Sequence, residues 1–377
     1  MFTALRPTAI FLIIICSLAF SLLGGCGSNT VRVCNATGCC GPADLCVAPR
    51  YLFADGLNGQ ISSFSINADG TLGSPTSISG PTQSLGMAAL SNQFLFASNP
   101  VIMSGGAIDA WSINLGSGAL TPVNGSPFII GPFSLASGLA VNQSAQVLYA
   151  ADAGKIDALQ IGATGALTTL LGSPFPAGTG LYVTVDPQDR FAFSSDSTPP
   201  GNVWAFTADS TGALTAVTGS PFAADPNSTT STNPSQIVVD STGSFVFVAL
   251  TATNQVAAFS IAPSTGVLTA VQGSPFPAGK GPLGLTTVNN LLYVANSMDG
   301  TVSGYIINST TGVLTAAQGS PFPIPAGALT TDIPGALLYA SSAQGMLVFS
   351  IDVTTGALTQ MGSPVASAGA TVLRYIQ

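Results

Sequence analysis

One phrase is repeated along the chain. It reads GALTTLLGSPFPAG at 165–178, GVLTAVQGSPFPAG at 266–279 and GVLTAAQGSPFP at 312–323. Its Gly-x-Leu start occurs at intervals of 44 to 54 residues, at Gly70, Gly118, Gly165, Gly212, Gly266, Gly312 and Gly356. A fixed period of this length is typical of repeat architectures, in which each repeat forms one supersecondary unit. Seven such units fill the chain from Arg50 onward.

Each unit contains four short runs with the character of β-strands, bounded by Gly, Pro, Asn, Asp or Ser. The second run is aromatic and β-branched, as in YLFA at 51–54 and FVFV at 245–248. The third run carries one bulky residue at a fixed position: Phe64, Trp111, Leu159, Phe206, Phe259, Tyr305 and Phe349. Four strands per repeat of 40–50 residues are the signature of a propeller blade. The sequence therefore predicts an all-β fold, a seven-bladed β-propeller of four-stranded antiparallel blades.

The repeated phrase itself is interpreted as architecture rather than chemistry. Its first Gly can take the positive φ that closes a short hairpin, which a side chain would resist. The GSPFPAG part is expected to end the fourth strand, because Pro has no amide hydrogen and cannot continue a ladder.

The two ends of the repeat region are expected to meet in one blade. The region begins at RYLFADG (50–56), already on a second strand, and its own first strand is missing. AGATVL at 368–373 matches AGALTT at 326–331, the first strand of the last complete unit. We therefore expect residues 368–376 to pair beside residues 51–54, so that a C-terminal strand closes the first blade and removes an open edge.

The N-terminal residues have the pattern of an export signal. Arg6 is followed by an apolar run at Thr8–Leu23 and by LLGGC at 22–26. An uncleaved membrane anchor is the alternative, but a spanning helix needs about 20 apolar residues. LGGC resembles the lipobox of bacterial lipoproteins, which implies a lipid on Cys26. We expect a lipoprotein signal peptide at 1–25, a stalk at 26–49 and the propeller at 50–377. The protein would then be exported to the bacterial cell envelope and meet the membrane through this lipid.

The stalk contains four further cysteines, Cys34, Cys39, Cys40 and Cys46. Four cysteines in an exported segment suggest two disulfides, for which three connectivities are open. Zinc is the alternative, although the spacing lacks the paired C-x2-C knuckles of usual zinc sites. We predict disulfides, no metal site and no cofactor.

The composition excludes several classes of function. Apolar residues make up 46% of the chain, which excludes disorder. Only 6% of residues are charged, with 7 Lys and Arg in all, so nothing could neutralise a row of phosphates. Nucleic acid is therefore not expected as a partner. The chain has no His, and each of its 15 acidic residues is Asp.

The segment LLYVANSMDGTVSGYIINSTTGVLTAAQGSPFP at 291–323 resembles the lactonase-type seven-bladed propellers, a group that includes 6-phosphogluconolactonase and carboxymuconate-cyclising enzymes. The resemblance covers residues 50–377 and implies the propeller fold. It also implies lactone-opening chemistry by His, Glu and Arg side chains in a central cleft. No position of this chain can carry the His or the Glu. No catalytic residue is assigned, and only an Asp could act as a base.

A ligand site is expected on the rim formed by the second-to-third-strand loops and the links between blades, which we call the loop rim. It carries the longest loops (98–107, 195–202 and 222–235), and loops on rigid scaffolds are frequent binding sites. The candidate ligand-binding residues there are Asp152, Lys155, Asp196, Lys280 and Asp299. The alternative is that these charges only solvate the loops.

Three functions remain open on the sequence. The first is a lipid-anchored propeller that acts as a surface binding or interaction module without the family's usual catalysis. The second is a lactonase, and the third is an assembly scaffold of the envelope. The expected partner at the loop rim is a small molecule, a glycan or a protein. Enzymatic activity is left undecided.

Overall fold

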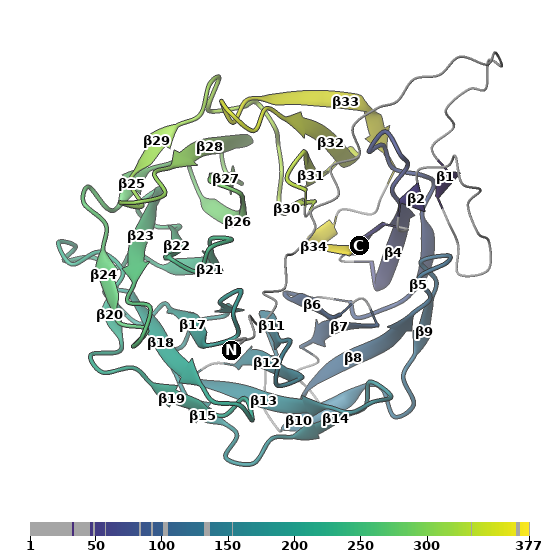
Figure 1. Cartoon of the computed structure of the whole chain (residues 1–377), viewed down its shortest axis with the longest axis horizontal. Coiled ribbons are helices and arrows are strands. Elements are labelled where there is room, and N and C mark those ends of the chain that lie inside the picture. Colours follow the sequence, from purple (N-terminus) through teal and green to yellow (C-terminus); the bar gives the residue numbers. More distant parts are fainter. Residues whose placement is uncertain are drawn as a thin grey trace, which may run out of the picture.

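The chain forms a ring of seven β-sheets, seen face-on in Figure 1. The structure, a computed structural model, describes residues 32–33, 46–47, 50–56, 58–82, 84–91, 93–100, 105–131, 136–152, 154–332, 334–366 and 370–376. Each sheet is one blade, and its strands are antiparallel and follow one another from the centre of the ring outward. The predicted seven-bladed β-propeller is confirmed.

The strands of the first four blades have the following bounds. Blade 1 contains β3 (Tyr51–Gly56), β4 (Gln60–Ser65), β5 (Thr76–Ser79) and β34 (Ala370–Ile376). Blade 2 contains β6 (Met87–Leu90), β7 (Phe94–Asn99), β8 (Gly106–Ile113), β9 (Leu120–Pro122) and β10 (Phe128–Gly131). Blade 3 contains β11 (Leu139–Asn142), β12 (Val147–Asp152), β13 (Lys155–Ile161), β14 (Leu167–Thr169) and β15 (Phe175–Pro176). Blade 4 contains β16 (Val183–Val185), β17 (Phe191–Asp196), β18 (Asn202–Ala208), β19 (Leu214–Ala216) and β20 (Phe222–Ala223).

The other three blades follow the same order. Blade 5 contains β21 (Pro234–Val239), β22 (Phe245–Leu250), β23 (Gln255–Ile261), β24 (Leu268–Ala270) and β25 (Phe276–Pro277). Blade 6 contains β26 (Pro282–Val288), β27 (Leu291–Asn296), β28 (Thr301–Ile307) and β29 (Leu314–Ala316). Blade 7 contains β30 (Leu329–Thr331), β31 (Leu337–Ser342), β32 (Gly345–Ile351) and β33 (Leu358–Val365). In a separate two-stranded sheet, β1 (Arg32–Val33) pairs in parallel with β2 (Cys46–Val47).

The core lies between adjacent blades. The second strand is buried over all six residues in six blades, which explains its uninterrupted apolar sequence. The seven bulky third-strand residues are 0 to 7% exposed, as their fixed position predicts. Phe259 of blade 5, for example, packs in one cluster with Phe193 of blade 4. Each blade thus buries its faces against its two neighbours.

The predicted closure of the first blade is confirmed. Strand β34 pairs antiparallel with β3, with Tyr51 opposite Ile376, Phe53 opposite Arg374 and Asp55 opposite Val372. In Figure 1 the yellow β34 lies inside the purple strands of blade 1. Residues from both ends of the repeat region therefore build one sheet.

Two structural constraints require Gly at the start of the repeated phrase. Gly266 adopts a φ of +72°, a left-handed conformation that side chains disfavour. A Cβ at this position would also meet the ring of Phe191, at 2.6 Å. Phe191 belongs to blade 4 and Gly266 to blade 5, so the turn is also a contact between blades.

The second half of the phrase departs from the expectation. Strand β24 does end before GSPF, but the chain does not leave the blade there, because Phe276 pairs again with Val256 of the third strand. Between the two segments that pair with the third strand, the side chain of the Ser of GSPF takes the place of the missing backbone hydrogen bond. Its hydroxyl accepts the N–H of Ala258 at 2.9 Å in blade 5, and equivalent bonds of 2.8–3.0 Å occur at Ser126, Ser173, Ser220 and Ser320.

Most of the N-terminal predictions concern residues outside the described ones. These are the signal at 1–25, the lipid on Cys26, and Cys34, Cys39 and Cys40 as disulfide partners; only the backbone of Cys46 is described, in β2. The described part of the chain contains no helix of the length and hydropathy that crossing a membrane requires.

Candidate functional site: the central channel

The ring surrounds a channel of about 520 Å³. It is lined by the innermost strand of every blade: β6, β11, β16, β21, β26, β30 and β34. One edge of each of these strands has no neighbour within its sheet, so backbone N–H and C=O groups as well as side chains face the channel. Such a concave site with few converging polar groups is the usual form of a small-molecule site.

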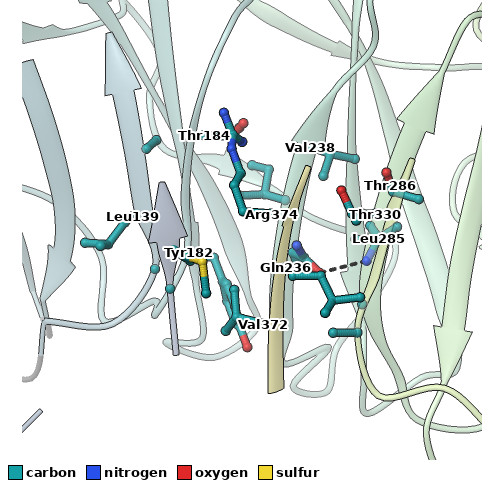
Figure 2. A pocket seen from close by; sticks show the side chains of 18 of the residues that line it. Leu139, Tyr182, Thr184, Gln236, Val238, Leu285, Thr286, Thr330, Val372 and Arg374 are labelled. Atoms are coloured by element: carbon teal, nitrogen blue, oxygen red, sulfur yellow. Dashed lines mark hydrogen bonds between the residues drawn. The ribbon is translucent and has the colours of Figure 1, made fainter. Parts of the chain in front are cut away.

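Four polar side chains lie at one level of the channel. Arg374 is paired with Phe53, Thr184 with Phe193, Thr286 with Tyr293 and Thr330 with Tyr339. These four partners occupy the same position of the repeat, so the inner residues opposite them share a level. We call Arg374, Thr184, Thr286 and Thr330 the polar belt; Figure 2 shows all four around the channel.

Arg374 is the only charged side chain among the described residues that line the channel. It is exposed to the channel, and within the described chain it forms no ion pair. The protein around it desolvates the guanidinium and lowers the pKa of Arg374 from its ordinary value. The group nevertheless stays protonated, because an Arg in a protein does not lose its proton. The belt thus carries one positive charge with no carboxylate against it.

Two further polar side chains, Gln236 and Tyr182, lie nearer the loop rim, at the level of Val372. The Gln236 side-chain oxygen Oε1 accepts the backbone N–H of Leu285 at 2.7 Å, the dashed line in Figure 2. Burial raises the pKa of Tyr182, so its phenol is neutral at physiological pH. This level therefore offers neutral hydrogen-bonding groups only.

Comparison with known proteins agrees with this architecture. The family described as "Lactonase, 7-bladed beta-propeller" matches residues 200–330. The resemblance to lactonase-type propellers is confirmed. No curated protein matches the chain.

Solved structures of lactonase-type propellers share the fold of this chain. A proposed 6-phosphogluconolactonase from Bacteroides fragilis is 18% identical, with a TM-score of 0.71 over 88% of this chain and 98% of that one. A proposed 6-phosphogluconolactonase from Bacteroides uniformis is 16% identical, with a TM-score of 0.72 over 87% and 99%. The periplasmic gluconolactonase of Pseudomonas aeruginosa is 16% identical, with a TM-score of 0.68 over 88% and 99%.

Three of the rim residues named from the sequence make local contacts in this propeller. The Lys155 ammonium lies 2.8 Å from an Asp152 carboxylate oxygen and 3.0 Å from one of Asp157. Asp196 accepts hydrogen bonds from the N–H groups of Thr179 and Thr198. Although burial opposes it, hydrogen bonds led by those from Thr198 lower the pKa of Asp196.

The other two rim residues are neighbours between blades 5 and 6. Asp299 accepts the backbone N–H of Lys280 at 2.8 Å and the Thr301 hydroxyl at 2.8 Å, which lower its pKa. The Lys280 side chain is exposed. The structure therefore brings Asp152 to Lys155 and Asp299 to the Lys280 backbone but does not gather the five residues, and none of them lines the channel.

Asp55, behind the channel wall, is a further feature that was not among the candidate ligand-binding residues predicted from the sequence. It is fully buried at the end of β3, opposite the channel-lining Val372. Burial raises the pKa of Asp55 to about 7, and the charge of Asp109 adds a smaller increase. Hydrogen bonds from Ser84 and from the Gly56 backbone lower the pKa but do not offset the burial. Asp109 accepts the Asn99 amide at 2.7 Å, and burial raises its pKa as well.

Metal chemistry gains no support from the described residues, since they contain no group of three His, Cys, Asp or Glu side chains able to hold an ion. Arg374 was not among the candidate residues identified from the sequence. The one signal for it was the alignment of 368–373 with 326–331, which puts Arg374 on an innermost strand.

Proposed function

We propose that this chain is an exported β-propeller that binds a small oxygen-rich anion in its central channel, without hydrolysing a lactone. The observation that carries the proposal is Arg374, a guanidinium inside the channel with no ion pair in the described chain. A planar guanidinium binds carboxylate or phosphate through two parallel hydrogen bonds.

The rest of the polar belt suits the same kind of ligand. Three threonine hydroxyls, of Thr184, Thr286 and Thr330, share the level of Arg374. A hydroxyl can both donate and accept, so it fits the hydroxyl groups of a sugar acid. The strand edges in the channel add backbone donors and acceptors.

The proposal of binding without hydrolysis rests on what lines the channel. Opening a lactone with water calls for a general base within reach of that water. The described residues that line the channel include no carboxylate or imidazole. The 377-residue sequence contains no His and no Glu that could supply one.

The test is calorimetric titration with D-gluconate, 6-phosphogluconate and neutral D-glucose. We expect the two anions to bind in preference to glucose, and Arg374→Met to weaken their binding at least tenfold because it removes the positive charge and the paired donors. Lys280→Met is the matched control, since this exposed cation lies outside the channel. Equal affinities of wild type and Arg374→Met would exclude the channel site, and a loss in Lys280→Met alone would favour the loop rim.

Lactone hydrolysis is the second candidate, favoured by the family match and by the names of the similar structures. Asp55 would have to be the base, because its pKa of about 7 suits proton transfer near neutral pH. Hydrolysis of D-glucono-δ-lactone above the uncatalysed rate, abolished in Asp55→Asn, would establish this activity. A rate equal to the uncatalysed one would leave binding as the function.

We further propose that the propeller is held at the bacterial cell envelope by a lipid on Cys26. The lipobox-like LGGC at 23–26 supports this proposal. Expression with radiolabelled palmitate should label the wild-type protein and leave Cys26→Ala unlabelled. Label retained in Cys26→Ala would contradict it.

A further inference from the structure

We infer that Gln236 is a fixed hydrogen-bond donor of the channel, so that the ligand carries an acceptor oxygen at a distance from its anionic group. This inference rests on the proposed anion site and specifies which anions that site selects. It assigns the anion to the polar belt and the acceptor to the level of Gln236, nearer the loop rim.

The orientation of the Gln236 amide follows from its partner. A backbone N–H only donates, so the atom 2.7 Å from the Leu285 nitrogen must be the amide oxygen. The NH2 group is then turned away from Leu285, and no other described group accepts from it. Because Gln236 lines the channel, this NH2 group is available to a ligand there. Reversing the amide would leave the N–H of the buried Leu285 without an acceptor, which disfavours the reversed orientation.

The spacing of the two levels sets the shape of the ligand. Val238 is opposite Phe247, the repeat equivalent of Phe53, so Val238 lies at the level of Arg374. Gln236 precedes Val238 by two residues, about 7 Å along a strand. In Figure 2 the Arg374 side chain extends from β34 away from Val372, which adds to this separation. The ligand is therefore elongated along the channel.

Gln236 also differs from the other polar group at its level. The phenol of Tyr182 can donate or accept, so it does not discriminate between ligand groups. Gln236 turns its NH2 group rather than its oxygen to the channel, because the amide oxygen faces the Leu285 N–H. A carbonyl or ether oxygen is favoured there, and an ammonium group is disfavoured.

The experiment measures the affinities of hexanoate, 5-oxohexanoate and 6-aminohexanoate for the full-length protein by ligand-observed NMR titration. The wild type should bind 5-oxohexanoate about tenfold more tightly than hexanoate, as one good hydrogen bond allows. Gln236→Leu should bring these two affinities together, because it removes the donor that distinguishes the two probes. Gln236→Glu still offers an oxygen to Leu285 but turns a negative acceptor to the channel. It should therefore prefer 6-aminohexanoate to 5-oxohexanoate.

The outcomes separate this inference from the proposed function. Inversion of the preference in Gln236→Glu supports it, because a merely structural glutamine would change the melting temperature without changing the order of the probes. If hexanoate binding depends on Arg374 but both Gln236 variants keep the wild-type order, the role of Gln236 is wrong and the anion site stands. If hexanoate does not bind, or binds equally to Arg374→Met, the anion site is wrong and the inference falls with it.

Discussion

At the scale of single residues, the lining of the channel differs between blades because some side chains break the repeat. The level of Arg374 is occupied in the other six blades by Ala88, Ala140, Thr184, Val238, Thr286 and Thr330. The symmetric fold supplies the space, and one asymmetric residue supplies the charge. A ligand is therefore expected to bind off the ring axis, against β34.

Asp55 gives the stability a pH dependence near neutrality. Its folded-state pKa of about 7 lies above its ordinary value of 3.8, so the folded protein keeps a proton that the unfolded chain has lost between those pH values. The protonated Asp55 carboxyl therefore adds to the free energy of unfolding. This stabilisation is fully present below the pKa of the unfolded chain and is lost as the pH rises through about 7. The free energy of unfolding changes by roughly 4 kcal/mol at most over this range.

Urea unfolding at pH 5 and pH 8 measures this effect. The wild type should be less stable at pH 8, and Asp55→Asn should remove most of the difference. Asp69→Asn, at an exposed turn, is the control and should keep it. A wild type equally stable at both pH values would contradict the buried, protonated carboxyl.

At the scale of elements, the fourth strand depends on a side chain to complete its ladder. The Ser274 hydroxyl accepts the N–H of Ala258, at the point where GSPF interrupts backbone pairing in blade 5. Ser274→Ala should lower the free energy of unfolding by about 1–3 kcal/mol, because it leaves a buried N–H without a partner. Chemical denaturation can compare it with Ser264→Ala, an exposed serine of the same blade that should be neutral. Equal stability of the two variants would mean that water replaces the hydroxyl.

The strands themselves could be predicted from the sequence, whereas this interruption could not. Runs such as FVFV at 245–248 and the position of Phe259 indicate buried strands through local pattern alone. Proline in GSPF correctly indicated that backbone pairing stops, but the serine bond reaches back 16 residues to Ala258 and has no local signature. The five charges named on the loop rim were visible as charges, but their contacts depend on how loops fold.

At the scale of the molecule, ring closure could be predicted because β34 matches the first strand of a complete repeat. The placement of Arg374 in the channel needs one further fact, the register of β34 against β3, which sequence matching alone did not supply. A register shift by one residue would turn every side chain of the strand to its other face.

Removal of residues 368–377 tests the closure. It deletes the buried side chains of Leu373, Tyr375 and Ile376, each worth about 1.5–3 kcal/mol. It also exposes the edge of β3 to association with other chains. We expect a lower melting temperature and oligomers in size-exclusion chromatography.

A rearranged chain provides the control for this truncation. Because Ile376 is opposite Tyr51, residues 368–377 can be placed ahead of Arg50 through a two-residue Asn-Gly turn. This variant should recover the stability and the monomer. A truncated protein that melts like the full-length chain would show that β34 does not close the ring.

The position of Arg374 in β34 also fixes when the proposed anion site is completed during synthesis. A ribosome makes β3 to β33 before the seven residues of β34. A nascent chain halted earlier therefore has an incomplete first blade and a channel without its guanidinium. Translation of one short strand therefore supplies both at once, so a product of premature termination would have an open edge in its first blade and would lack the proposed anion site.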